Sequence, residues 1–239
     1  MDASRRSTDI RGYGVPILTG LLIVAAGTVP FLLLARLNAR VRPDLPWAAV
    51  VTLAYLAVMV IWLNGSGPPT SNADRRRQRL RLWLRSKADP YGQSPVVIIA
   101  LMALLAFVWV MMSRTSPLPD LTAYPTTSYR WSMFLMGGVV AGVVEEVAYR
   151  GYMQTGLEEH DRANAIWITS LVFTASHITH GIGTLLVMAP GLFIASMLYG
   201  ALARRTGTIL PGIALHVMGD LARVYFGVLR GDSSLLIVN

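Results

Sequence analysis

The sequence contains no cysteine, which excludes disulfide bonds, thiolate catalysis and cysteine-ligated metals from this chain. Charged residues are also scarce, because only 14% of the 239 residues are Asp, Glu, Lys or Arg. Basic residues outnumber acidic ones, 21 to 13, which gives a net charge of +8. These basic residues fall between hydrophobic segments rather than on a soluble domain, so we expect no nucleic-acid partner.

Long apolar runs are what the sequence has in abundance. Hydrophobic residues make up 54% of the chain, and several runs approach the ~20 residues that cross a bilayer. We therefore predict an all-α fold, a polytopic transmembrane helical bundle in the cell membrane. About seven spans are expected, at Val15–Ala35, Pro46–Leu63, Val96–Met112, Trp131–Glu158, Asn164–His180, Thr184–Ala203 and Ile209–Leu229. Residues 1–130 hold the first three, and residues 131–239 form the functional core of one integrated membrane domain.

The connection at residues 64–94 is rich in arginine, with seven of the 21 basic residues in the stretch ADRRRQRLRLWLRSK. Leu80, Trp83 and Leu84 would share one face of a helix, which predicts an amphipathic interfacial helix over Arg75–Lys87. Its basic face would bind anionic lipid headgroups, although a solvated basic loop is the alternative. Because Lys and Arg favour the cytoplasmic side, we expect the N-terminus and this loop in the cytoplasm.

Two adjacent carboxylates and an arginine interrupt the fourth apolar run, GGVVAGVVEEVAYRGY. Charged side chains at membrane depth cost several kcal/mol, so such residues are functional candidates. Residues four apart stack on one helical face, which pairs Glu146 with Arg150 and leaves Glu145 free to face a cavity. A structural ion-pair ladder is the alternative. Tyr149, one turn after Glu145, could donate a hydrogen bond to the site.

Three further polar residues lie within the later runs: His177, His216 and Asp220. His216 and Asp220 are four residues apart and share a helical face. Glu145 and His177 each lie 13 residues from the ends of the connection between their spans, roughly 20 Å at the rise of an α-helix. We therefore expect all of these groups to converge near the middle of the membrane.

A site of this composition supports more than one chemistry. A carboxylate with an imidazole can activate water as a general base, and a second histidine with a carboxyl group can stabilise an oxyanion. Alternatively, Glu145, His177 and His216 could supply the ligands of a catalytic zinc ion. A proton-coupled transporter could also use buried Glu, His and Asp, but repeated halves would be expected and none is found.

Three ordered motifs resemble those of the CPBP family: EEVAYRGY, FTASH and HVMGD. That family comprises the type II CAAX prenyl endopeptidases and the bacteriocin-processing or immunity proteins, also called Abi. The resemblance implies an intramembrane endopeptidase in which Glu145 and His177 activate water. It also implies an oxyanion hole of His216 and Asp220, the latter at a position often held by asparagine, with Glu146 and Arg150 as supporting residues.

The resemblance sets the remaining expectations for function. The substrate would be a membrane-associated protein or peptide, with or without a lipid, and the alternative is a non-catalytic immunity or scaffold protein of the same family. We expect no cofactor, because zinc bound by Glu145, His177 and His216 would leave Asp220 as the main oxyanion donor. An ionised carboxylate cannot donate a hydrogen bond.

Overall fold

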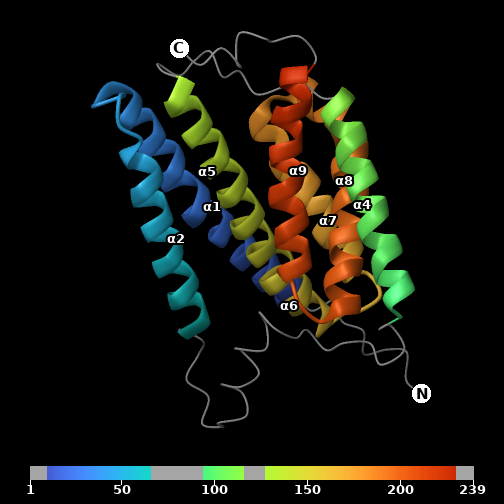
Figure 1. The fold of residues 1–239 in the computed structure, drawn as a ribbon. Helices are drawn as coiled ribbons and strands as arrows, with labels where there is room; N and C mark the ends of the chain where they lie inside the picture. The colour runs from blue at the N-terminus through green and yellow to red at the C-terminus, as the bar shows by residue number, and fades with distance from the viewer. Residues whose placement is uncertain (1–9, 66–93, 116–126, 230–239) are drawn as a thin grey trace, which may run out of the picture.

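The structure is a computed structural model that describes residues 10–65, 94–115 and 127–229, and within these ranges it is entirely helical. Figure 1 shows the arrangement of the helices. The α-helices and the two other helical segments are α1 (Ile10–Arg40), α2 (Trp47–Gly65), α4 (Pro95–Thr115), α5 (Thr127–Glu145), η2 (Glu146–Gln154), α6 (Thr155–Glu158), α7 (Ala165–Ser176), η3 (His177–His180), α8 (Ile182–Thr206) and α9 (Leu210–Leu229). The predicted all-α class is confirmed for this part of the chain. The predicted interfacial helix at Arg75–Lys87 lies outside it.

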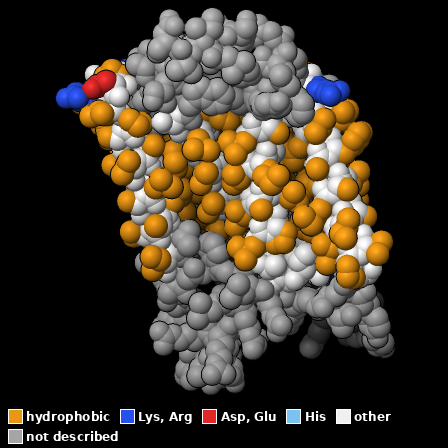
Figure 2. Space-filling view, in the orientation of Figure 1, with side chains coloured by type: hydrophobic (Ala, Val, Ile, Leu, Met, Phe, Trp, Pro, Cys, Tyr) orange, Lys and Arg blue, Asp and Glu red, His pale blue; other side chains and the backbone are white. Residues whose placement is uncertain are grey.

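Among the described residues, three helices are long and apolar enough to cross a membrane: Gly12–Arg40, Pro95–Arg114 and Ile182–Thr206. The apolar helices Trp47–Met59 and Leu210–Ala222 are shorter. The predicted count of about seven spans is therefore not confirmed. The surface supports the membrane assignment, since hydrophobic side chains cover the middle of the visible face and charged ones gather near its upper edge (Figure 2).

The fifth predicted span is the clearest departure from expectation. Helix α7 has 12 residues, which at the rise of an α-helix is about 18 Å and well short of a bilayer core of about 30 Å. The chain then tightens into the 3₁₀ turn η3 and reverses at Gly181, whose φ of 91° suits a residue without a Cβ. The apolar run was long enough to predict one span, but the α-helix ends at Ser176 and the last residues of the run form the turn.

The helices form one bundle with two groups, α1, α2 and α5 on one side and α4, α7, α8 and α9 on the other (Figure 1). Helix α5 continues through η2 into α6, so the predicted single helix through the glutamates is confirmed. One hydrophobic cluster joins Phe31 of α1, Leu56 of α2 and Val140 of α5. A second hydrophobic cluster includes Met112 of α4 and Tyr149 of η2. Residues on both sides of residue 130 thus share a core, while the functional division at that residue stays a prediction.

The start of α1 is fastened to the connection between α6 and α7. Tyr13 Oη donates to Asp161 Oδ2 at 3.2 Å, and hydrogen bonds from Asn164 lower the pKa of the Asp161 carboxyl group. Because α1 is 31 residues long, the α1–α2 turn at Arg42 lies at the opposite end of the bundle. The ends of the bundle can therefore be distinguished by named residues.

Candidate functional site

The helix that carries the two glutamates changes its winding between them. Glu145 is the last residue of α5, and Glu146 is the first of nine residues in the π-helix η2. A regular α-helix was expected here, so this part of the prediction was wrong. A π-helix closes i to i+5 hydrogen bonds and is usually found as a single turn at a functional site. Eight of the nine residues of η2 are buried, which places this rare segment in the interior of the bundle.

Glu146 and Arg150 form the predicted pair. Arg150 Nη1 lies 3.0 Å from Glu146 Oε1, and both side chains have no exposed surface. Arg150 Nη2 also donates to the backbone oxygen of Ser196 at 3.2 Å and to its Oγ at 2.8 Å. The guanidinium lies 4.8 Å from the ring centre of Phe173 and 5.1 Å from that of Tyr199. Arg150 therefore ties η2 to α7 and α8 at the centre of the protein.

His216 joins this pair from α9. Its Nδ1 lies 3.1 Å from Glu146 Oε1, and because an ionised carboxylate only accepts, Nδ1 is the donor. This bond directs Nε2 toward Glu145, with 3.8 Å between Nε2 and Glu145 Oε2. Only 3% of His216 is exposed, and the Tyr199 ring stacks on the imidazole with centroids 5.0 Å apart. The sequence predicted convergence of these residues but not the bond from His216 to Glu146.

The Glu145 side chain differs from its neighbour in both exposure and bonding. It keeps 19% of its side-chain surface exposed, whereas Glu146 keeps none. Within the part of the chain that the structure describes, Glu145 Oε2 is buried and has no hydrogen-bond partner. One carboxylate is thus held by a cation and an imidazole, and the other is held by neither through a hydrogen bond. This agrees with the predicted division between a tied and a free glutamate.

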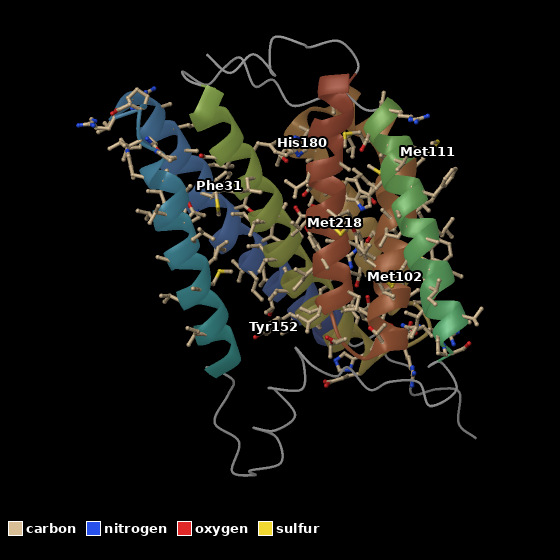
Figure 3. All side chains as sticks on the ribbon, viewed as in Figure 1. Phe31, Met102, Met111, Tyr152, His180 and Met218 are labelled. Atoms are coloured by element: carbon tan, nitrogen blue, oxygen red, sulfur yellow. The ribbon has the colours of Figure 1, made fainter. Side chains whose placement is uncertain are left out.

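His177 reaches the same region from the opposite helix. Its Nδ1 lies 2.8 Å from the backbone oxygen of Phe173 and donates to it, so in the neutral ring Nε2 keeps its lone pair. The Phe173 ring lies 4.8 Å from the His177 ring and 6.3 Å from that of His216. Both histidines therefore flank one phenylalanine. The ring of His180 lies 5.8 Å from that of His177, and Figure 3 shows His180 near the upper end of the bundle.

Asp220 and Tyr149 occupy the edges of this group. Asp220 is half-buried one turn after His216, and a Cβ built at Gly138 of α5 would lie 3.4 Å from its own Cβ. Tyr149 Oη donates to Ser176 Oγ at 2.8 Å, and Ser176 donates to the Phe173 oxygen that also accepts from His177. The hydrogen bond expected from Tyr149 therefore goes to Ser176, which donates to the same backbone oxygen as His177.

Several residues around the site were not predicted: Trp109, Ser176, Ser196 and Tyr199. Ser176 lies inside the motif FTASH and could have been noticed there. Tyr199 and Ser196 are three apart on α8, a spacing that also occurs in ordinary packing. Trp109 belongs to an apolar run without any polar signal. These contacts depend on tertiary packing, which the local pattern does not reveal.

The alternative zinc site requires that three donor side chains lie close enough together to bind one ion. Among the described residues, no three His, Asp or Glu side chains are grouped so that they could hold a metal ion. The expected ligands Glu145, His177 and His216 therefore do not form a ready site, and His216 Nδ1 already bonds Glu146. The metal-free mechanism stays a prediction.

Comparison with known proteins gives one match. Residues 127–222 match the family model described as type II CAAX prenyl endopeptidase Rce1-like, which extends from the start of α5 into α9 and includes every candidate site residue. A search of curated proteins and a search of solved structures each found no match. The matched family and the apolar helices together support a membrane protein of the endopeptidase kind. The resemblance that three short motifs predicted is thus confirmed, since residues 127–222 of this chain are similar to the Rce1-like type II CAAX prenyl endopeptidase family.

Proposed function

We propose that this protein is an intramembrane endopeptidase that uses Glu145 as a general base to hydrolyse a peptide bond. The observation that carries the proposal is the unequal treatment of two adjacent glutamates. Glu146 is bound through Oε1 by both Arg150 and His216, whereas Glu145 Oε2 faces His216 Nε2 at 3.8 Å. Among the described residues neither Glu145 Oε2 nor Glu146 Oε2 has a hydrogen-bond partner, so the difference between the glutamates lies in the cation and imidazole that hold Glu146. A buried carboxylate oxygen that is not held by a cation is costly at membrane depth unless it is used, which favours a chemical role for Glu145.

In the proposed reaction, Glu145 takes one proton from water, while His177 Nε2 accepts a hydrogen bond from the O–H that remains in the resulting hydroxide. The hydroxide oxygen adds to the carbonyl carbon of the substrate, and the carbonyl oxygen becomes an oxyanion. His216, in its protonated form, donates from Nε2 to that oxygen, with Asp220 beside it. Collapse of the intermediate breaks the carbon–nitrogen bond, and the proton held by Glu145 passes to the leaving amine.

The proposed substrate is a membrane-associated protein or peptide, with lipidated proteins among the candidates. The support is the matched family together with the apolar surface of the bundle. The alternative function is that of a non-catalytic immunity or scaffold protein. Such a protein would need the Glu146–Arg150–His216 core for folding but would have no use for Glu145.

Membrane proteomes of cells that carry the wild-type protein, Glu145→Ala or the control Glu159→Ala test this proposal. Glu159 is an exposed glutamate of the α6–α7 connection, so it controls for the loss of one carboxylate. We expect new peptide ends in cells with the wild type and with Glu159→Ala, and their loss with Glu145→Ala. Identical peptide ends in all three proteomes would favour the non-catalytic alternative.

We also propose that the N-terminus faces the cytoplasm and that Arg75–Lys87 binds anionic headgroups of the inner leaflet. Helix α2 ends, and α4 begins, at the end of the bundle where α1 starts (Figure 1). The end of α2, the start of α4 and the start of α1 therefore lie on one side of the bundle. The distribution of Lys and Arg also assigns the N-terminus and the arginine-rich segment to one side of the membrane, so the arrangement of the helices supports the proposal.

Single cysteines can report this orientation, because the chain has none of its own. Exposed Arg42 and exposed Arg162 lie at opposite ends of the bundle. With an impermeant thiol reagent on intact cells, we expect Arg42→Cys to be labelled and Arg162→Cys to be labelled only after permeabilisation. The reverse pattern would contradict both the orientation and the leaflet assignment.

A further inference from the structure

Trp109 is part of α4, outside residues 127–222, yet its indole packs on the helix that carries His216 and Asp220. Only 6% of Trp109 is exposed, and its ring centroid lies 5.6 Å from that of His216. A Cβ at Gly219 would lie within 2.3 to 2.6 Å of three indole atoms. The indole therefore occupies the space that a side chain would fill at Gly219, which is on the same helix as His216 and Asp220.

The indole also holds a second ring of the site. Trp109 Nε1 donates to Tyr199 Oη at 2.6 Å, and both residues belong to one buried cluster. The Tyr199 ring is stacked on the His216 imidazole, with an interplanar angle of 19°. Trp109 thus contacts His216 on its own account and fixes the ring that covers a face of the imidazole.

This support matters because one hydrogen bond does not fix an imidazole. The bond from Nδ1 to Glu146 sets the distance of His216 from that carboxylate, but the ring can still tilt about the bond. A tilt would move Nε2 away from Glu145, 3.8 Å distant. Rings packed against the imidazole restrict this motion, and a stacked aromatic pair adds to its stabilisation.

We propose that Trp109 is a positioning residue, which holds Tyr199 against His216 and thereby keeps His216 Nε2 directed at Glu145. The catalytic consequence rests on the function proposed above, whereas the positioning itself does not. It follows that α4 contributes to the site, although it lies outside the matched segment of the chain.

The first test observes the His216 ring directly. The chain has four histidines, so isotope-labelled histidine in a lipid nanodisc gives few signals, and loss of one in His216→Asn assigns it. We expect Trp109→Phe and Tyr199→Phe each to shift and broaden the His216 signal. The control Trp167→Phe removes an indole at a residue that is 53% exposed, and should leave that signal unchanged. An unchanged His216 signal in both test variants would overturn the proposal.

The second test separates positioning from stability. Each single change leaves a buried polar group without its partner, whereas the double variant Trp109→Phe/Tyr199→Phe removes both and should regain thermal stability. We expect the rate of Glu145-dependent cleavage, kcat, to fall about tenfold in all three variants, with KM unchanged. Recovery of kcat together with stability in the double variant would show a merely structural role and overturn the proposal.

The two tests also distinguish this inference from the proposed function. If Glu145→Gln retained full cleavage while the His216 signal still changed in Trp109→Phe, the proposed mechanism would fail and the positioning would stand. If Glu145→Gln abolished cleavage while the His216 signal and kcat were unaffected by Trp109→Phe, the positioning would fail alone.

Discussion

Replacing Arg150 by alanine is expected to cost about 3 to 5 kcal/mol of folding free energy, because it removes the guanidinium that compensates the buried charge of Glu146. The two side chains have no exposed surface, and Arg150 also bonds Ser196 of α8. Its guanidinium packs against the Phe173 and Tyr199 rings, so their contacts would be lost too. The measurement is the thermal unfolding temperature and the yield of folded protein in detergent or nanodiscs.

Arg42→Ala is the matched control for this change. Arg42 also pairs with a carboxylate, through two bonds of 3.0 and 2.8 Å to Asp44, but its side chain is 65% exposed. Exposed pairs contribute little to stability, so the control should unfold at the wild-type temperature. Similar losses in both variants would mean that burial of the Arg150 pair has no special importance.

The Glu146–Arg150 pair could be predicted because its contact depends on local spacing alone. Four residues approximate one turn in an α-helix, and the pair also forms within η2, although the π winding itself was not foreseen. The bond from His216 to Glu146 could not be predicted in the same way. It requires α9 to approach η2 closely, and a Cβ at Gly212 would lie 2.8 Å from Glu146 Oε2. Such an approach is decided by packing between distant segments.

Depth along the helices was predictable, but the partners of the polar groups were not. Counting residues placed Glu145 and His177 at a common level and led us to expect convergence with His216, whose Nε2 lies 3.8 Å from Glu145 Oε2. The same counting could not show that Phe173 lies between His177 and His216, or that α7 is only 12 residues long. The length of an apolar run limits how far a helix can extend, but it does not show at which residue the helix ends.

Glu145→Gln is expected to leave folding nearly intact and to lower the rate of cleavage by about 10²- to 10⁴-fold, the range of general-base catalysis. Glutamine keeps the shape of the side chain, and no hydrogen bond to Glu145 Oε2 is lost. Glu146→Gln should behave differently, because it removes the charge that pairs with Arg150 and the acceptor of His216 Nδ1. The measurements are thermal unfolding and the rate of cleavage of a substrate found in the proteome comparison.

The different effects of Glu145→Gln and Glu146→Gln would distinguish a catalytic glutamate from a structural one. If Glu145 is the base and Glu146 the support, the first substitution removes turnover from a stable protein and the second removes the stable protein. Wild-type protein should also keep its activity after exhaustive zinc chelation, since Glu145 then acts on water without a metal. Equal destabilisation by the two glutamines would contradict the division of roles. Stoichiometric zinc, with activity lost on its removal and restored on its return, would instead make Glu145, His177 and His216 metal ligands.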